Sequence, residues 1–332
     1  MNGQARAAMG TDVSRSTVTV SIPAYNAREV LERAVGSVLS QTYPCHEIII
    51  VDDGSSDGTQ DLIADLAARH SIVKPVIRER NGGVSAARNL GFAHATGDWL
   101  AILDADDAWK PERIATLIEA AERVGADYVM DNMVLYDSIA KREHRRMIAP
   151  SWSVLPLTME RYFRNCRLGG PQYAILKPIV RRSFVERTGL RYDEECGNGQ
   201  DLIDHGEALA LGASAIVLAE PLYIYTTRVG GFSKRANSSS RTKMNFQGIA
   251  DRIDALRLRH GSAIRGAADR QARLCRRSFM VGDRLNRYRD LRRGGKRVLG
   301  WAKLLSDPSG VLLTARMRYR RWMVQRPPYT LG

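Results

Sequence analysis

The densest group of chemically active side chains in the sequence is a run of carboxylates. Asp104, Asp106 and Asp107 fall within the four residues Asp104-Ala105-Asp106-Asp107. Carboxylates this close repel one another, and a hard divalent cation that bridges them to phosphate oxygens offsets the repulsion. A solvated acidic turn or a helix cap is the other interpretation of such a run. Its position at the end of a predicted buried strand, with a second acidic group at an equivalent place, favours a metal site.

The second acidic group is the segment Asp52-Asp53-Gly54-Ser55-Ser56-Asp57-Gly58. It can be a turn in which Ser56 or Asp57 caps the following helix. Asp53 can instead accept a hydrogen bond from an imide N–H such as that of uracil, and Tyr25 can supply a ring on which a base stacks. A rim aromatic without a ligand is the alternative interpretation of Tyr25. In either case the segment is predicted to be a turn that follows a strand.

Alternating strands and helices must position these residues. Strands are predicted from short apolar runs, and helices from apolar side chains at helical spacing. The alternation is typical of an α/β fold with a doubly wound, mainly parallel sheet and helices on both faces. Such sheets bind ligands outside the carboxyl ends of their strands, so both acidic groups are expected at one crevice. In the first 124 residues the predicted strands are 18–23, 47–51, 73–77 and 99–103, and the predicted helices cover about 28–40, 62–67, 85–95 and 111–124. Residues 136–170 are expected to be irregular, and short strands are predicted at 215–218 and 222–225.

Other classes of nucleotide-binding protein have less support. No GxGxxG follows the first strand and no GxxxxGK[ST] occurs, which argues against dinucleotide and P-loop sites. A nucleotidyltransferase is an alternative, but it would place a glycine-rich basic loop where this chain reads Pro23-Ala24-Tyr25-Asn26. A nucleic-acid-binding protein would carry basic and aromatic residues across its folded body. Residues 1–250 hold 29 Lys and Arg against 30 Asp and Glu, so we expect no nucleic-acid partner.

Two stretches of the chain resemble the inverting glycosyltransferases of family 2, which have the GT-A fold. They are residues 18–60 (VTVSIPAYNAREVLERAVGSVLSQTYPCHEIIIVDDGSSDGTQ) and 80–107 (RNGGVSAARNLGFAHATGDWLAILDADD). The resemblance implies a UDP-sugar donor, with glucose as the sugar, and a divalent metal, Mn²⁺ or Mg²⁺, at the DxD motif. It also implies the following site residues: Pro23 and Tyr25 line the base, Asp53 binds uracil, Arg88 orders the crevice and the phosphates, Asp104 faces the ribose or the metal, and Asp106, with Asp107 as a further ligand, coordinates the metal.

The second half of the chain is similar to those members of the family that build bacterial exopolysaccharides of the succinoglycan type. In the family a Glu-Asp pair supplies the catalytic base, and this chain has Gln200-Asp201 there. The resemblance implies that Asp201 removes the proton of the acceptor hydroxyl, and one base suffices for a single in-line attack at the anomeric carbon. Gln200 puts the local hydrogen bonds in doubt and leaves a catalytically silent relative as an alternative. The matching segments are residues 190–194, 199–201, 220–225 and 226–233.

Neighbouring polar residues could complete the site. Arg228, Ser233 and Lys234 are candidates for a lid over the diphosphate, with a solvated basic loop as the alternative. Asp201 can also serve as a helix N-cap, and the two roles are compatible. His205, four residues after Asp201 on a predicted helix, could lie near the acceptor, whereas the other histidines give no signal.

The end of the chain holds the whole excess of positive charge. Residues 251–332 contain 21 Lys and Arg against 6 Asp and Glu. A helix with this composition can lie in a membrane interface, while a helical subdomain packed on the body and an RNA-binding tail are the alternatives. We expect an anionic membrane surface as partner, a saccharide on polyprenyl diphosphate as acceptor, and a cytoplasmic, peripheral location at the inner face of the cytoplasmic membrane. The apolar residues at helical spacing are Val311, Leu312, Ala315, Tyr319 and Trp322, and the arginines around them are Arg316, Arg318, Arg320 and Arg321.

The cysteines and the apolar runs predict a protein with reduced thiols and without a membrane span. Four cysteines without CxxC spacing predict neither a zinc site nor a disulfide framework. No apolar run is long enough to span a membrane, and the first residues lack the apolar core of a secretory signal. The predicted units are a flexible N-terminus (1–16), a GT-A domain (17–240) with a donor half (17–135) and an acceptor half (136–240), and a basic helical region (241–332).

Overall fold

A ten-stranded sheet forms the centre of the molecule. The computed structural model describes residues 15–138, 140–148, 150–197, 199–227 and 244–325. The strand order is β3-β2-β1-β4-β9-β6-β10-β5, with β7 beside β6 and β8 beside β10. Strands β1 to β4 pair in parallel, β10 is parallel to β6, and β9 runs antiparallel between β4 and β6. The strands are β1 (Val18–Ala24), β2 (Glu47–Asp52), β3 (Val73–Ile77), β4 (Trp99–Ile102), β5 (Ala108–Trp109), β6 (Tyr128–Asp137), β7 (Arg142–Arg146), β8 (Val154–Pro156), β9 (Pro178–Arg181) and β10 (Ala215–Thr227).

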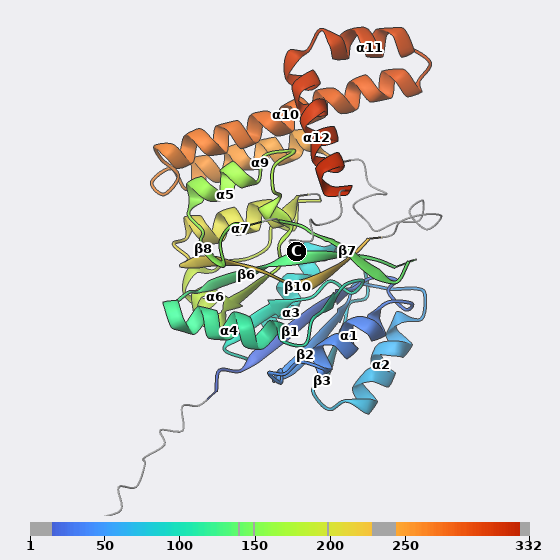
Figure 1. The fold of residues 1–332 in the computed structure, drawn as a ribbon. Helices are drawn as coiled ribbons and strands as arrows, with labels where there is room; N and C mark the ends of the chain where they lie inside the picture. Colours follow the sequence, from blue (N-terminus) through green and yellow to red (C-terminus); the bar gives the residue numbers. More distant parts are fainter. Residues whose placement is uncertain (1–14, 139, 149, 198, 228–243, 326–332) are drawn as a thin grey trace, which may run out of the picture.

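Helices cover both faces of the parallel half of this sheet (Figure 1). Successive side chains of a strand point to opposite faces, and β2 is buried on both. Ile50 lies in the same hydrophobic cluster as Val35 of α1, whereas Ile49 lies in a second cluster with Ala87 of α3. The predicted doubly wound arrangement is thereby confirmed. The helices are α1 (Leu31–Leu39), α2 (Thr59–Arg69), α3 (Val84–His94), α4 (Arg113–Val124), α5 (Met159–Asn165), α6 (Arg182–Thr188), α7 (Gln200–Ala210), α9 (Phe246–Arg259), α10 (Ala267–Arg293), α11 (Arg297–Leu305) and α12 (Pro308–Gln325).

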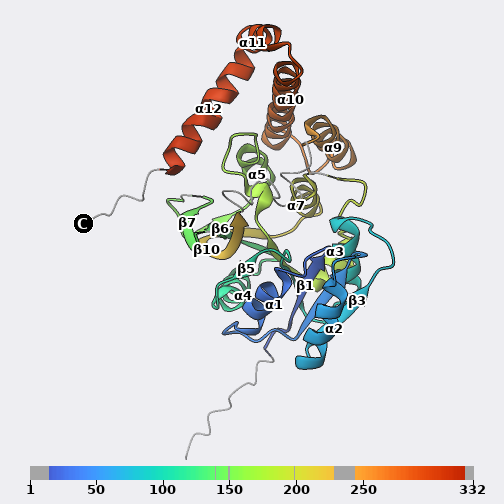
Figure 2. The ribbon, with the colours of Figure 1, turned by 90° about the vertical axis from the view of Figure 1, so that its right-hand side faces the viewer.

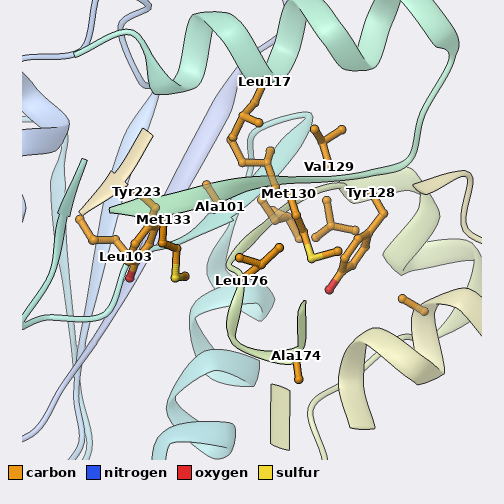
Figure 3. Close-up of a cluster of buried hydrophobic side chains, with 14 of the residues drawn as sticks. Ala101, Leu103, Leu117, Tyr128, Val129, Met130, Met133, Ala174, Leu176 and Tyr223 are labelled. Atoms are coloured by element: carbon orange, nitrogen blue, oxygen red, sulfur yellow. The ribbon is translucent and has the colours of Figure 1, made fainter. Parts of the chain in front are cut away.

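The core of the second half is built around β6, with side chains on both of its faces (Figure 3). Leu117 of α4 and Val129 lie on one side of the strand, and Tyr128 and Leu176 lie on the other. All four residues are buried. Strand β6 is therefore fixed between α4 and the segment that leads into β9.

Long-range pairing changes two of the predicted elements. The sequence predicts short strands at 215–218 and 222–225, but β10 is one strand of thirteen residues that pairs with β6 through an irregular register near Pro221. Residues 136–170, expected to be irregular, contain the end of β6, then β7, β8 and α5. Both changes depend on contacts between distant segments, which local periodicity does not reveal.

The C-terminal helices divide into a part that belongs to the core and a part that leaves it. Ile249 and Ile253 of α9, and Cys275 and Phe279 of α10, lie in the same hydrophobic cluster as the sheet. Helices α11 and α12 follow, and α11 lies at the end of the molecule away from the sheet (Figures 1 and 2). The division at residue 241 stays a prediction, and these contacts favour a boundary further along, within α10. None of the described helices is both long enough and apolar enough to cross a membrane.

Candidate active site

The loops after β1 and β2 are fastened to each other, and a tyrosine projects beside them. Asn26, at a left-handed φ of 49°, donates its backbone N–H to Ser55 Oγ (2.9 Å) and accepts at Oδ1 from the Ser56 backbone N–H (2.9 Å). Tyr25 is 54% exposed, so its ring is available for stacking. Pro23 is buried within β1. Of the two residues predicted to line a base, Tyr25 is therefore the one that presents a surface to solvent.

Asp53 fastens a third loop, the one between β3 and α3. Its Oδ1 accepts from Arg78 Nη1 (2.5 Å) and from the Gly82 backbone N–H (3.0 Å), and its Oδ2 accepts from the Gly83 backbone N–H (2.8 Å). The residue is buried. An ionised carboxylate offers about four acceptor positions. The predicted hydrogen bond to uracil stays a prediction, and it would add a fourth donor to this carboxylate.

Four charged side chains from four separate segments meet where β4 and α7 approach each other. Arg88 of α3 bonds Asp201 Oδ1 through Nη1 (2.5 Å) and Asp104 Oδ1 through Nη2 (2.8 Å). Lys177 Nζ lies 2.8 Å from Asp201 Oδ2 and 3.0 Å from Asp104 Oδ2. Each carboxylate oxygen thus contacts one cation. The fold brings together Arg88, Asp104 and Asp201, which the sequence singled out separately, and it adds Lys177.

The charges of this cluster balance, and all four groups stay ionised at neutral pH. Burial alone would raise the pKa of Asp201, but Arg88 and Lys177 together hold that pKa far below its ordinary value. The pKa of Asp104 is lowered for the same reason, against the opposing effect of burial. Burial would lower the pKa of Lys177, and the two carboxylates raise it instead. Asp201 is therefore an ionised carboxylate whose proton affinity depends on how tightly two cations hold it.

Hydrogen bonds outside the cluster set the positions of its members. The Lys177 carbonyl accepts from Arg113 Nη2 (2.8 Å), and Arg113 is fully buried in an ion pair with Asp131 of β6 (2.7 Å). Asn89, the residue after Arg88, donates to the Tyr192 carbonyl (2.9 Å), which ties α3 to the segment that precedes α7. Sequence reasoning missed Lys177 and Asn89. A lone lysine in the apolar run 174–180 was the one signal for Lys177.

The carboxylates at the end of β4 have different surroundings. Asp107 is buried, and it accepts from the Tyr223 hydroxyl at Oδ2 (2.8 Å) and from the Thr226 backbone N–H at Oδ1 (2.8 Å). Burial and the neighbouring charges of Asp106 and Asp104 raise its pKa well above the ordinary value. Asp106 is partly exposed. Both carboxylate oxygens of Asp107 consequently accept hydrogen bonds from β10, and its role as a further metal ligand stays a prediction.

The remaining donor set fits a divalent cation that is completed by a nucleotide. Asp104 and Asp106 supply carboxylate oxygens, the ligands that Mg²⁺ and Mn²⁺ prefer. Within the described ranges no group of three or more His, Cys, Asp or Glu side chains is placed to hold a metal ion. Mg²⁺ typically takes one or two protein carboxylates and completes its shell with water and substrate phosphates. Two carboxylates at a strand end are therefore adequate protein ligands.

The other residues that the sequence singled out are His205, Gln200 and the three lid candidates. His205 is buried, with Nδ1 2.6 Å from the Tyr128 hydroxyl and Nε2 3.0 Å from the Leu176 carbonyl oxygen. Both ring nitrogens are engaged inside the core, while the charges of Asp201 and Lys177 still act on the ring, so the position of His205 near an acceptor stays a prediction. Gln200 is the first residue of α7 and only partly exposed. The lid candidates Arg228, Ser233 and Lys234 lie outside the described residues.

Comparison with known proteins identifies the family. The family model described as Glycosyl transferase family 2 matches residues 19–184, half of the chain. The chain belongs to glycosyltransferase family 2. The predicted family is thereby confirmed, and the nucleotidyltransferase alternative is set aside.

Relatives within the family include two bacterial polysaccharide proteins. The succinoglycan biosynthesis protein ExoO of Rhizobium meliloti (strain 1021) is 35% identical over 220 residues, which are 65% of this chain and 62% of ExoO. The succinoglycan biosynthesis protein ExoU of the same organism is 28% identical over 271 residues, 77% of each chain. The present chain therefore spans somewhat less than two thirds of the length of ExoO.

A solved structure shares the fold of this family 2 chain. The crystal structure of S. aureus TarS residues 1–349 in complex with UDP-GlcNAc superposes with a TM-score of 0.60 at 19% sequence identity, and covers 76% of this chain and 69% of that one. The GT-A fold implied by the resemblance is confirmed by this likeness together with the sheet topology.

Proposed function

We propose that this chain is a metal-dependent inverting glycosyltransferase that moves a sugar, glucose, from a UDP-sugar to a saccharide acceptor in exopolysaccharide biosynthesis. The observation that carries the proposal is the convergence of Asp201 of α7 with Arg88 and Asp104 at the carboxyl ends of the parallel strands. The names of two relatives support a role in exopolysaccharide biosynthesis, since ExoO and ExoU are both succinoglycan biosynthesis proteins. The TarS complex with UDP-GlcNAc supports a UDP-sugar donor.

The donor occupies the ends of β1, β2 and β4 in this proposal. Tyr25 stacks on the uracil ring, Asp53 accepts from its imide N–H, and Asp104 faces the ribose. Asp106 and Asp104 would hold a Mn²⁺ or Mg²⁺ ion, which would neutralise charge on the departing diphosphate. Arg88 and Lys177 lie beside these carboxylates and supply further positive charge.

Asp201 is the general base. The acceptor hydroxyl oxygen attacks the anomeric carbon, the bond from that carbon to the diphosphate oxygen breaks, and the hydroxyl proton passes to a carboxylate oxygen of Asp201. In the structure, Asp201 Oδ1 contacts Arg88 and Asp201 Oδ2 contacts Lys177, and these two cations make Asp201 a weak base. The donor diphosphate offers Arg88 and Lys177 a competing anion. Donor binding therefore raises the basicity of Asp201, and the base becomes effective after the donor has bound.

The acceptor in this proposal is a saccharide on polyprenyl diphosphate, and the enzyme acts as a peripheral protein at the inner face of the cytoplasmic membrane. Its basic C-terminal region, which carries 21 Lys and Arg against 6 Asp and Glu, supplies attraction to an anionic surface. This placement gives the enzyme access to a lipid-linked acceptor.

A panel of nucleotide sugars tests the donor and the metal together. Hydrolysis of each donor in the absence of an acceptor is measured with Mn²⁺, with Mg²⁺ and with excess chelator, and UDP-glucose with metal is expected to react fastest. Hydrolysis that is unchanged in chelator would reject the metal. Donor binding without turnover of any donor or acceptor would instead identify a catalytically silent relative.

Asp201→Asn tests the assignment of the base. The rate of transfer is expected to fall by roughly 10²–10⁴, the usual contribution of a positioned general base, while the Kd for the UDP-sugar changes little. Asp251→Asn, at an exposed position on α9, is the matched control and should leave both quantities unchanged. Loss of donor binding in Asp201→Asn would show that this residue acts on the donor side. A gain in rate for Gln200→Glu would show that Gln200 lowers an activity that the site retains.

A further inference from the structure

Helix α11 turns an apolar stripe toward solvent instead of toward the protein. Its buried residues are Gly300 and Leu304, which face the neighbouring helices. Val298, Trp301 and Leu305, here called the α11 stripe, are 84%, 47% and 70% exposed. Their spacing of three and four residues places them on one face of the helix. A helix of a globular protein normally turns such a face to its core, so this stripe lacks its expected cover.

Basic residues adjoin the α11 stripe at Trp301. Arg289, Arg292, Arg293 and Arg297, together with Trp301, line a concavity of about 630 Å³ where α10 meets α11. The Arg292 guanidinium lies over the Trp301 ring, 4.5 Å from its centroid. From residue 291 to residue 306 the chain contains five Lys and Arg and no Asp or Glu. The exposed apolar residues and the cationic concavity are therefore parts of one surface.

This surface lies at an extremity of the molecule. Both views place α11 at the end of the molecule away from the sheet, where the chain turns from α10 into α12 (Figures 1 and 2). Leu312 of α12, 70% exposed, is a further apolar residue near this turn in the chain. A flat partner can therefore approach α11 without meeting the body.

We propose that α11 is a membrane-docking helix, which lies in the interface of an anionic phospholipid bilayer. The α11 stripe inserts at the level of the headgroups and upper acyl chains, and the arginines of the concavity bind lipid phosphates. Arginine suits this role because its planar guanidinium donates two hydrogen bonds to phosphate. The proposal rests on the proposed function only for the reason to be at a membrane, since binding can be measured without transfer.

The chemistry of the surface distinguishes a bilayer from RNA. RNA would use the arginines, but it would gain little from Val298 and Leu305, whose burial is favourable only in an apolar environment. The sequence places the membrane-binding residues in α12, at positions 311–322. The side chains of Arg316 and of residues 318–325 lie outside the described ones, and the described exposed stripe is on α11.

Vesicle binding by the full chain tests the proposal. Binding to phosphatidylglycerol–phosphatidylcholine vesicles is measured by co-sedimentation at low and high salt, with pure phosphatidylcholine vesicles as reference. The intact protein is expected to prefer the anionic vesicles and to bind less as salt rises. In the double variant Val298→Ser with Leu305→Ser, affinity is expected to fall by about tenfold or more. Leu258→Ser on α9 is the matched control, because Leu258 is 84% exposed, like Val298.

A second pair of variants tests the arginines. Arg293→Gln with Arg297→Gln is expected to weaken binding and flatten its salt dependence, whereas Arg265→Gln with Arg270→Gln, at exposed positions near the start of α10, should not. Hydrolysis of UDP-sugar is measured for every variant, and it tests the fold and the proposed function independently of vesicle binding. Absence of binding by the intact protein at low salt would overturn the proposal. So would full binding by the serine variant, or an equal affinity for an oligoribonucleotide that the same arginines control.

Discussion

Neighbouring residues of one acidic run have different roles because the fold gives them different surroundings. The sequence predicts a cluster of carboxylates at the end of a strand, and three of them are there. It could not predict that Asp107 turns toward Tyr223 and Thr226 of β10, because these partners lie more than a hundred residues away. The same limit hid Lys177, whose contacts with Asp104 and Asp201 exist only after β9 has inserted beside β4.

Asp106→Asn is expected to lose activity, whereas Asp107→Asn is expected to lose stability. Asp106→Asn should remove most of the metal-stimulated transfer with little change in Tm, because Asp106 is partly exposed at the crevice. Asp107→Asn should lower the free energy of unfolding by about 1–3 kcal/mol, since an amide nitrogen cannot accept from the Tyr223 hydroxyl or the Thr226 N–H. Metal titrations of activity and thermal melting separate the two effects. A normal Tm with weakened metal dependence in Asp107→Asn would instead identify that residue as a metal ligand.

His205 makes the stability of the protein dependent on pH on the acid side. Burial lowers the pKa of His205 to about 4, whereas an unfolded histidine titrates near 6.5. The unfolded state therefore binds more protons between these values, and stability falls as pH decreases through this window. The contribution lost is up to about 3 kcal/mol. Urea unfolding at neutral pH and near pH 5 should show the loss, and His205→Gln should reduce the dependence on pH. An unchanged dependence in His205→Gln would exclude this residue as its cause.

At the level of elements, the local pattern predicts the donor half better than the acceptor half. The four predicted strands 18–23, 47–51, 73–77 and 99–103 correspond to β1 to β4, because each is an apolar run bounded by turn residues. Strand β9 and the length of β10 were missed, since both depend on pairing with β6. The pattern also does not show how closely α3 approaches the sheet, which determines where Arg88 lies.

Gly91 sets the distance between α3 and β1. A Cβ atom at this position would lie 2.0 Å from Ser21 Oγ, 3.1 Å from Ser21 Cβ and 3.3 Å from Val51 Cγ2. In Gly91→Ala the Ser21 hydroxyl must therefore rotate, and the two remaining contacts press α3 away from the sheet. We expect a loss of about 1–3 kcal/mol in stability and a lower rate, because Arg88 lies one turn earlier on the same helix. Gly36→Ala in α1 is the matched control. Nothing lies within 4 Å of its Cβ, and it should gain about 0.5–1 kcal/mol. Equal effects of the two substitutions on Tm would contradict the close approach.

At the level of the whole molecule, the C-terminal helices have two separate functions in this scheme. Helix α9 supports the start of α7, since a Cβ atom on Gly199, two residues before Asp201, would lie 2.8 Å from Ile249. The His260 imidazole, just after α9, lies 2.7 Å from Glu207 of α7. Helix α11 instead packs against α10 and α12 and lies at the end of the molecule away from the sheet (Figure 2). These contacts favour a boundary within α10, inside the basic residues 251–332.

Two truncations locate this boundary. A chain that ends at residue 295 lacks α11 and α12, and it is expected to melt cooperatively and to hydrolyse UDP-sugar at the normal rate while losing its affinity for anionic vesicles. A chain that ends at residue 243 also lacks α9 and α10, and the loss of buried Ile249, Ile253 and Phe279 should abolish cooperative melting. Ile249→Ala in the full chain provides an independent measure, with an expected loss of about 2–5 kcal/mol and slower hydrolysis. Normal hydrolysis by the shorter chain would show that the catalytic domain ends before α9, as the sequence predicts. Inactivity of the longer one would show that α11 and α12 contribute to the site itself.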